Sequence, residues 1–257
     1  MTYRFARERQ DYVDFATGRV FQSIPGHTAF PVRLASEIFQ RCVALYQQRG
    51  GRVPCILYDP CCGGASLLCA AAYLHWPALE QVIGSDIDPQ ALQLAGRNLS
   101  LLTLPGLETR TAQLQSMLAE YGKPSHAEAL ESAQRLRSRL NELLSTHSVT
   151  ARIFLADATQ ECAIQEHLGD LKVDIVMMDI PYGLHSSWQV PDRQWAARPQ
   201  PTQQVLKAVL PVLSPQAVVA VSASRLQKFA YAGYQRLDYF TVGKRRIVFL
   251  TADKTVA

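Results

Sequence analysis

The chain has 257 residues, of which 48% are hydrophobic, so it can bury one large core. It holds no run of about 18 apolar residues and its N-terminus lacks the apolar stretch of a signal peptide, which argues against a membrane or secreted protein. Its charge is uneven, because residues 1–52 and 225–257 carry +4 and +5 while residues 53–224 carry −5. We therefore expect a cytoplasmic monomer without membrane contact, and nucleic acid is one candidate partner.

The predicted elements alternate between helices and short apolar strands. Residues 1–30 predict an irregular arm, and residues 31–49 predict a helix that begins near Pro31. Five runs rich in Val and Ile predict strands covered on both faces, at 53–59, 81–88, 151–157, 173–179 and 217–223. Helical stretches lie between them, at 65–75, 89–102 and 201–213. Two last runs, at 234–240 and 245–252, predict an antiparallel hairpin.

This order predicts an α/β fold, a doubly wound, Rossmann-like sheet of seven mostly parallel strands. We expect one domain over residues 1–257. Residues 105–150 are too long for a usual connection and predict an inserted helical segment. A helix at 126–145 has an apolar face, and Arg135, Arg137 and Arg139 lie around the rest of its surface. Together with the basic ends, these arginines predict contacts with a phosphate backbone.

Four predicted strands end in, or just before, a carboxylate. These residues are Asp59, Asp86, Asp157 and Asp179. In doubly wound sheets, ligands bind in the crevice outside the carboxyl ends of the strands. A single acid at such a place is usually a helix cap or a turn residue, but four at corresponding places favour a ligand site. The six cysteines form no C-x-x-C pair, so we expect free thiols and no metal site.

The loop after the first strand favours a nucleoside cofactor without a pyrophosphate. Gly63 and Gly64 let the backbone approach a ligand, yet the dinucleotide and P-loop patterns are absent. Asp86 is placed to take both hydroxyls of a ribose, and Asp157 to accept from an adenine amine. The acid Asp59 before the glycines favours a cationic or amine-bearing ligand. These features together predict S-adenosylmethionine rather than NAD.

Residues 173–183 resemble the motif (D/N)-P-P-(Y/F/W) of methyltransferases that modify exocyclic amino groups. The order of Gly loop, ribose acid, adenine acid and this motif resembles that of class I S-adenosylmethionine-dependent methyltransferases. Further stretches resemble the avilamycin-resistance rRNA methyltransferase family, at 26–41, 59–64, 81–89, 121–125 and 179–183. The resemblance implies methylation of a guanosine in large-subunit ribosomal RNA, with antibiotic resistance as one consequence.

The resemblance also implies a set of catalytic residues. Asp179 and a carbonyl of Ile180 or Pro181 would accept hydrogen bonds from the target amine, so that its lone pair becomes available to the methyl group. Pro181 would stiffen the loop, and Tyr182 would stack on the base. Ile180 departs from the proline of the general motif. If a ring nitrogen is the target instead, the role of Asp179 changes.

The same resemblance implies further cofactor contacts. Phe30 and Arg33 would form a lid on the cofactor side, where Arg33 pairs with the methionine carboxylate, although an ordinary surface arginine is the alternative. Cys61 would line the cofactor loop as a packing residue. The family's loop reads D-P-C-C-G-S-G, whereas this chain has an alanine at the last position, Ala65.

Two other functions fit the sequence less well. An amino-methyltransferase acting on DNA adenine or on a protein glutamine would need the same motif. A non-catalytic RNA-binding or ribosome-assembly factor could keep the fold, but the retention of Asp86, Asp157 and the D-x-P-Y cluster argues against it. The basic ends favour RNA over protein without separating RNA from DNA.

Overall fold

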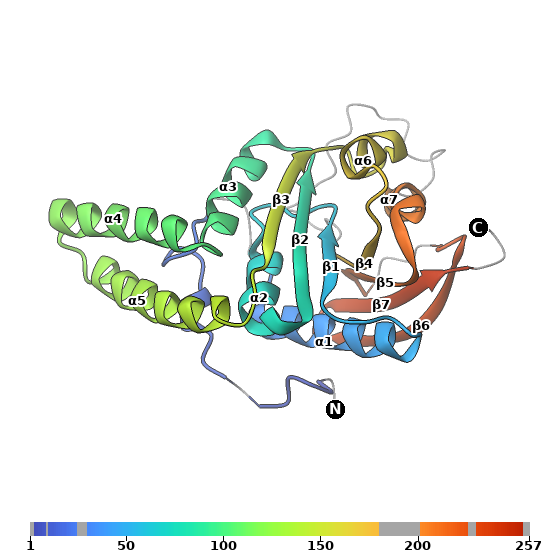
Figure 1. Cartoon of the computed structure of the whole chain (residues 1–257), viewed down its shortest axis with the longest axis horizontal. Helices are drawn as coiled ribbons and strands as arrows, with labels where there is room; N and C mark the ends of the chain where they lie inside the picture. The colour runs from blue at the N-terminus through green and yellow to red at the C-terminus, as the bar shows by residue number, and fades with distance from the viewer. Residues whose placement is uncertain (1–2, 9, 25–29, 180–200, 226–229, 254–257) are drawn as a thin grey trace.

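The computed structural model describes residues 3–8, 10–24, 30–179, 201–225 and 230–253 (Figure 1). It has one seven-stranded sheet with the order β3-β2-β1-β4-β5-β7-β6. The strands are β1 (Cys55–Asp59), β2 (Leu79–Asp86), β3 (Thr150–Leu155), β4 (Val173–Asp179), β5 (Leu213–Ser224), β6 (Tyr234–Val242) and β7 (Arg245–Ala252). Strands β1 to β5 are parallel, and β7 runs antiparallel to both β5 and β6. The predicted fold class is therefore confirmed.

Helices cover both faces of the sheet. They are α1 (Val32–Gln48), α2 (Ser66–His75), α3 (Pro89–Ser100), α4 (Leu104–Tyr121), α5 (Pro124–Leu144), α6 (Glu161–Leu168) and α7 (Pro201–Val209). One apolar cluster packs the first five helices, α1 through α5, against the face of the sheet to which Leu57 points. A second cluster packs α6 and α7 against the other face, to which Tyr58 points. Because neighbouring residues of a strand point to opposite faces, continuous apolar strands are needed to fill both layers.

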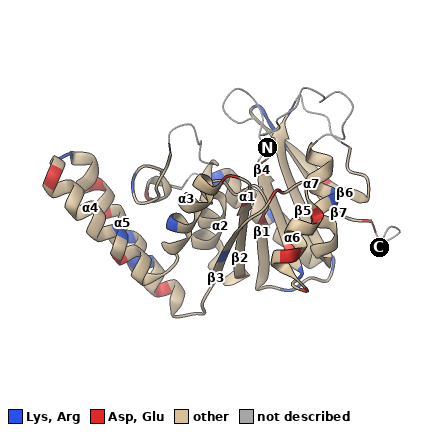
Figure 2. Ribbon diagram, turned by 90° about the horizontal axis from the view of Figure 1, so that it is seen from above, with Lys and Arg blue, Asp and Glu red and all other residues tan. Residues whose placement is uncertain are grey.

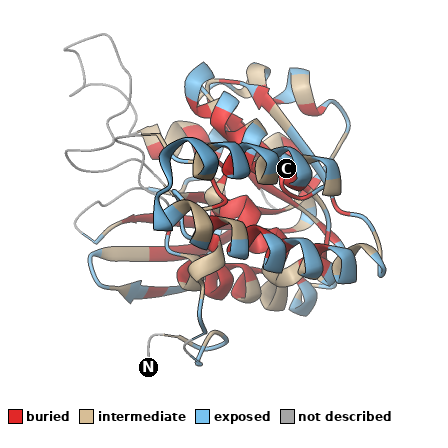
Figure 3. Cartoon of the chain, turned by 90° about the vertical axis from the view of Figure 1, so that its left-hand side faces the viewer, coloured by how far each residue is buried: buried red, intermediate tan, exposed pale blue. Residues whose placement is uncertain are grey.

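The insertion consists of two helices, whereas the sequence predicted only the second. Helices α4 and α5 pack against each other and project beyond the β3 edge of the sheet (Figure 1). Helix α4 buries only Leu107 and Leu114, so its apolar face is too sparse to give a clear period. The predicted face of α5 is buried, including Ala129 and Leu136. The outer surfaces of this projecting pair are exposed (Figure 3).

The N-terminal arm is held by Glu37, a buried residue of α1. Its side chain is 0% exposed and accepts hydrogen bonds from the backbone N–H groups of Arg4, Phe5 and Ala6 at 2.6, 2.8 and 2.7 Å. Arg41 Nε donates to it at 2.7 Å. Burial alone would raise the pKa of Glu37, but these bonds lower it below its ordinary value. The start of the arm is thereby tied to α1.

A second part of the arm is fixed against the insertion. Arg135 of α5 pairs with Asp14 at 2.7 Å, and Arg19 pairs with Glu128 of α5 at 2.7 Å. Arg110 of α4 donates to the carbonyl oxygens of Arg19 and Val20 at 2.9 Å each. The insertion thus serves as a support for residues 14–20. This contact could not be read from a pattern in the arm, because the partners are far apart in the chain.

Candidate active site

The predicted acids gather at one edge of the sheet. Strands β1 and β4 are neighbours although they are not consecutive, so the strand order reverses between them. Asp59 ends β1 and Asp179 ends β4, on the two sides of this switch point. Asp86 ends the next strand, β2, and Asp157 follows β3. This edge is where ligands bind in open α/β sheets.

Asp86 holds the loop that connects β1 to α2. One of its carboxylate oxygens accepts from the N–H of Gly63 at 2.8 Å, and the other from the N–H of Asp88 at 3.0 Å. Each oxygen of an ionised carboxylate has two lone pairs, so both can still accept a further bond. Asp88 caps α3 by accepting from the N–H of Gln90.

The loop itself adopts left-handed backbone conformations at two positions. Gly63 has φ of 51°, and a Cβ added to it would meet no atom within 4 Å, so the loop is open on that side. Ala65 has φ of 57° at the start of α2, although it carries a side chain and is buried. Glycine adopts this region without strain, which is why an alanine here is unusual.

Asn98 of α3 holds this loop in place, a role that no motif in the sequence indicated. Its side chain is 1% exposed, and its Nδ2 donates to the carbonyl oxygen of Gly64 at 2.8 Å. The same amide pairs with Gln22 of the arm, donating to its carbonyl oxygen at 3.1 Å and accepting from its N–H at 2.8 Å. One buried side chain therefore joins the cofactor loop, α3 and the N-terminal arm.

Burial shifts the ionisable groups next to the loop. Asp59 is only 3% exposed and accepts from the N–H of Cys61 at 3.0 Å. Burial raises its pKa well above the ordinary value, and the nearby carboxylates of Asp86 and Asp179 raise it further. Burial and the carboxylates of Asp59 and Asp86 also raise the pKa of the Cys61 and Cys62 thiols. A thiol in such surroundings is a poor nucleophile, which agrees with a packing role.

Asp179 is held by two side chains that the sequence did not identify. Ser222 of β5 donates its hydroxyl to Asp179 Oδ1 at 2.7 Å, and Arg245 Nη2 of β7 lies 3.7 Å from Asp179 Oδ2. Burial raises the pKa of the Asp179 carboxyl, and the bonds to Ser222 and Arg245 offset part of that rise. The guanidinium carbon of Arg245 also lies 5.3 Å from the ring centre of Phe30. Phe30 is thereby brought to the Asp179 side of the site.

The other predicted site residues have local partners or lie outside the described residues. Asp157 Oδ1 accepts from the N–H and hydroxyl of Thr159 at 2.9 and 2.7 Å, and its adenine role stays a prediction. Arg33 donates to the carbonyl oxygens of Ala6 and Arg7 in the arm, at 2.8 to 3.0 Å, so its described contacts are structural. Its pairing with a methionine carboxylate stays a prediction. Ile180, Pro181 and Tyr182 lie outside the described residues.

A family model described as rRNA methyltransferase AviRa matches residues 1–245 of this chain. The chain belongs to this rRNA methyltransferase family. A 23S rRNA (guanine(2535)-N(1))-methyltransferase from Streptomyces viridochromogenes is 39% identical over 252 residues, which cover 97% of this chain and 96% of that protein. Two solved structures of the rRNA methyltransferase AviRa from the same organism match with TM-scores of 0.83 and 0.84, at 38% identity, over 97% of this chain and 96% of theirs.

The family membership confirms the resemblance drawn from the sequence motifs and identifies the chain as a methyltransferase. The similarity extends over nearly the whole chain, so it includes the insertion and the arm. Among the described residues, no helix combines the length and the apolar character needed to cross a membrane.

Proposed function

We propose that this protein transfers a methyl group from S-adenosylmethionine to N1 of a guanine in large-subunit ribosomal RNA. The observation that carries the proposal is the Asp179 carboxylate, held between Ser222 and Arg245 at the switch point of the sheet. The relative from Streptomyces viridochromogenes, named for guanine N1 of 23S rRNA, supports the choice of atom.

The cofactor residues present suit S-adenosylmethionine. The open space at Gly63 leaves room for a ligand beside the loop, and Asp86 keeps lone pairs for two ribose hydroxyls. No pyrophosphate-binding loop is needed, because this cofactor has no phosphate. When bound, it supplies an electrophilic methyl group on a positively charged sulfur. The acidic side chains of Asp59, Asp86 and Asp179 meet at this edge, and their mutual repulsion, which contributes to the raised pKa of Asp59, is relieved by such a positive charge.

Guanine N1 carries a proton, so methylation there requires a base as well as an acceptor. In the proposed step, the bond between N1 and the methyl carbon forms as the bond between that carbon and sulfur breaks, and the N1 proton passes to Asp179. The raised pKa of Asp179 brings it closer to neutral pH, where a general base is most effective. Its two oxygens can face N1–H and the adjacent amine of the same base edge. This edge forms the Watson–Crick pair, so the base must be unpaired or flipped.

A single-turnover assay tests the catalytic role. Full-length protein is mixed with labelled S-adenosylmethionine and 23S rRNA, and the methylated position is read as a stop in reverse transcription, because a methyl group on N1 blocks pairing. Asp179→Asn keeps the shape and can still accept from Ser222, but it cannot take a proton. We expect its rate to fall by about 100-fold to 10,000-fold while cofactor affinity stays near that of the wild type. A rate within threefold of the wild type would rule out Asp179 as the base.

Calorimetry tests the cofactor site separately. Asp86→Ala removes an acceptor of the ribose and also the partner of the Gly63 N–H, so affinity for S-adenosylmethionine should fall by about 1.5–3 kcal/mol, roughly tenfold to 150-fold. Unchanged affinity would mean that the cofactor does not bind at the end of β2.

The same methylation assay, with DNA or protein in place of RNA and with labelled S-adenosylmethionine, shows whether RNA is the preferred substrate. Methylation of either in its place would favour the alternative amino-methyltransferase function.

The biological consequence follows from the family resemblance. We propose that the modified guanine lies where a ribosome-targeting antibiotic binds, so that methylation lowers sensitivity to the drug. Expression of the wild-type and Asp179→Asn chains in a sensitive host tests this. Equal drug sensitivity of both strains, with methylation seen only in the first, would contradict a role in resistance.

A further inference from the structure

The arginines of the insertion, which the sequence suggested for RNA binding, are engaged within the protein. Arg135 pairs with Asp14 and approaches Glu131 at 3.9 Å, and Arg137 pairs with Glu108 at 3.0 Å. Basic and acidic segments alternate along α4 and α5 (Figure 2). A phosphate that binds here must compete with carboxylates already in place. This surface is therefore a poor candidate for the main RNA contact.

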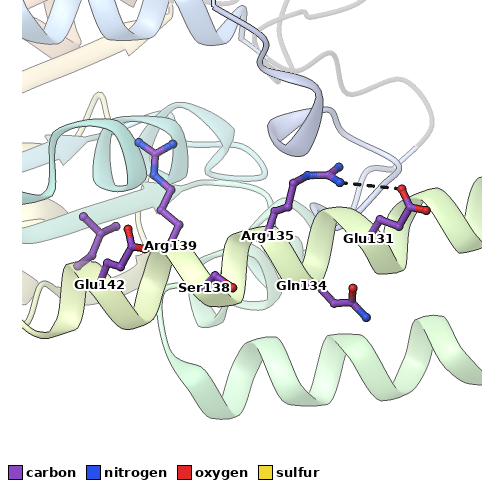
Figure 4. A pocket seen from close by; sticks show the side chains of 7 residues that line it. Glu131, Gln134, Arg135, Ser138, Arg139 and Glu142 are labelled. Carbon is purple, nitrogen blue, oxygen red and sulfur yellow. Dashed lines mark ion pairs between the residues drawn. The ribbon is translucent and has the colours of Figure 1, made fainter.

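A groove along α5 leads to the same conclusion. It has a volume of about 750 Å³ and is lined by two arginines, Arg135 and Arg139, and by two acids, Glu131 and Glu142 (Figure 4). The guanidinium carbon of Arg139 lies 5.8 Å from the ring centre of Phe15 in the arm. The groove has no excess of positive charge, so nothing in it favours a polyanion.

A different basic surface lies on the C-terminal hairpin. Tyr239 of β6 is 52% exposed, and two guanidinium groups lie over its ring, those of Arg236 at 5.1 Å and Arg246 at 5.3 Å from the ring centre. Among the described residues, neither arginine forms an ion pair with a carboxylate. Lys244 lies in the turn between the two strands and is exposed. We name Arg236, Tyr239, Lys244 and Arg246 the hairpin surface.

The local charge balance favours an anion on this surface. The acid closest in sequence to Tyr239 is Asp238, and it pairs with Arg41 of α1 at 3.4 Å. It also accepts from the N–H of Tyr239 at 2.7 Å. Arg41 also pairs with Glu37, so it balances Asp238 only in part, but the three basic residues of the hairpin surface still outnumber this one acid. Strand β6 is at the edge of the sheet, and no further strand within the described part of the chain covers it.

The hairpin surface begins next to the candidate active site. Strand β7 runs antiparallel to β5 and pairs Arg245 with Ser224, so β7 starts at the edge where the parallel strands end. Arg245 reaches Asp179 on one face of the sheet, and Arg246, the next residue with its Cα about 3.8 Å away, points to the opposite face. Thr241 pairs with Arg246 across the hairpin, and the surface continues from there along β6 to Tyr239. A nucleotide strand whose target base lies at Asp179 reaches this surface by crossing the edge of the sheet where β7 starts.

We propose that the hairpin surface binds the RNA segment next to the methylated guanine. Arg236, Lys244 and Arg246 contact phosphates, and an unpaired base stacks on the Tyr239 ring or on a guanidinium plane. Stacking on an aromatic ring or a guanidinium plane requires a base that is not already stacked in a duplex. The surface therefore suits a single-stranded segment or a loop, as does an unpaired target base. This inference rests on the proposed function and names the element that positions its substrate.

The test compares paired variants by fluorescence anisotropy with a labelled loop fragment of 23S rRNA, using the full chain. Arg236→Gln with Arg246→Gln removes two phosphate contacts, so binding should weaken and the slope of log affinity against log salt should fall by about 1.4 to 1.8. The matched control, Arg137→Gln on the insertion, should leave both unchanged. Tyr239→Ala should weaken binding about fivefold to 150-fold, whereas Tyr239→Phe retains it. Thermal unfolding checks that each variant is folded.

Kinetics separate positioning from chemistry. For the double variant, KM for RNA should rise while turnover at saturating RNA stays near that of the wild type, because neither arginine contacts Asp179. An unchanged salt slope, or an equal loss in Arg137→Gln, would overturn the inference. So would a dimer of the wild type that the double variant separates, since β6 would then pair two copies. If the wild type binds RNA through this surface but does not methylate guanine, the proposed function fails and the inference stands.

Discussion

Replacement of Asn98 by leucine should destabilise the protein and loosen the cofactor loop. The side chain is buried at 1% exposure and makes three hydrogen bonds, two with Gln22 and one with Gly64. Leucine has a similar size but can make none of them. Each such bond contributes about 1 kcal/mol, so the loss should be about 3 kcal/mol. For a protein of this size, that corresponds to a fall in Tm of about 6–12 °C.

Urea unfolding and calorimetry measure the two effects separately. The first gives the free energy of unfolding, and the second gives the affinity for S-adenosylmethionine, which should fall because Gly64 loses its anchor. Asn98→Asp is a useful second variant, since it keeps the size of the side chain and the acceptor for the Gln22 N–H. It replaces the amide NH2 by an oxygen that cannot donate to the carbonyl oxygens of Gln22 and Gly64. The control Asn141→Leu changes an exposed position of α5 and should alter stability by no more than about 0.5 kcal/mol.

The reasoning is wrong if Asn98→Leu unfolds within about 1 kcal/mol of the wild type. That result would mean that water or a rearranged arm replaces the lost bonds. A loss of stability with unchanged cofactor affinity would be more specific. It would show that the Asn98 amide holds the arm to α3 but does not set the geometry of the loop at Gly64.

Two further predictions concern buried carboxyl groups with opposite pKa shifts. The pKa of Asp59 is raised by burial, so its charged form destabilises the fold as the pH rises. The free energy of unfolding of Asp59→Asn, measured by urea titration, should therefore exceed that of the wild type by about 1–3 kcal/mol at pH 8. Near pH 3, where the wild-type carboxyl is protonated, the difference should disappear. The pKa of Glu37 is lowered, so its contribution is present above the unfolded value of about 4.5 and is lost as the pH falls through the folded value. Glu37→Gln should therefore lower stability at pH 7 but not near pH 3, and an equal effect at both would exclude the charge as the cause.

Much of the fold could be predicted because its signals are local. A strand such as β4 is a continuous apolar run, and the predicted range of 173–179 is the observed one. Acids at the ends of parallel strands must share one edge, so the grouping of Asp59, Asp86 and Asp179 followed from the predicted parallel direction of the strands. Helix α4 was missed because only two of its residues are fully buried, and without an apolar face the sequence has no clear helical period.

The sequence by itself determined the sheet, the Gly loop and the identity of the carboxylates, because each depends on residues that are close along the chain. Only the tertiary structure decided which charged side chains have a partner within the protein. Arg135 and Asp14 are 121 residues apart, and their contact shows that the insertion supports the arm, whereas its contact with RNA stays a prediction. Asn98 with Gln22, and Arg245 with Asp179, are likewise joined only by folding. A hydrogen bond or ion pair depends on distance in space, and composition records the charge of an arginine but not the partner that neutralises it.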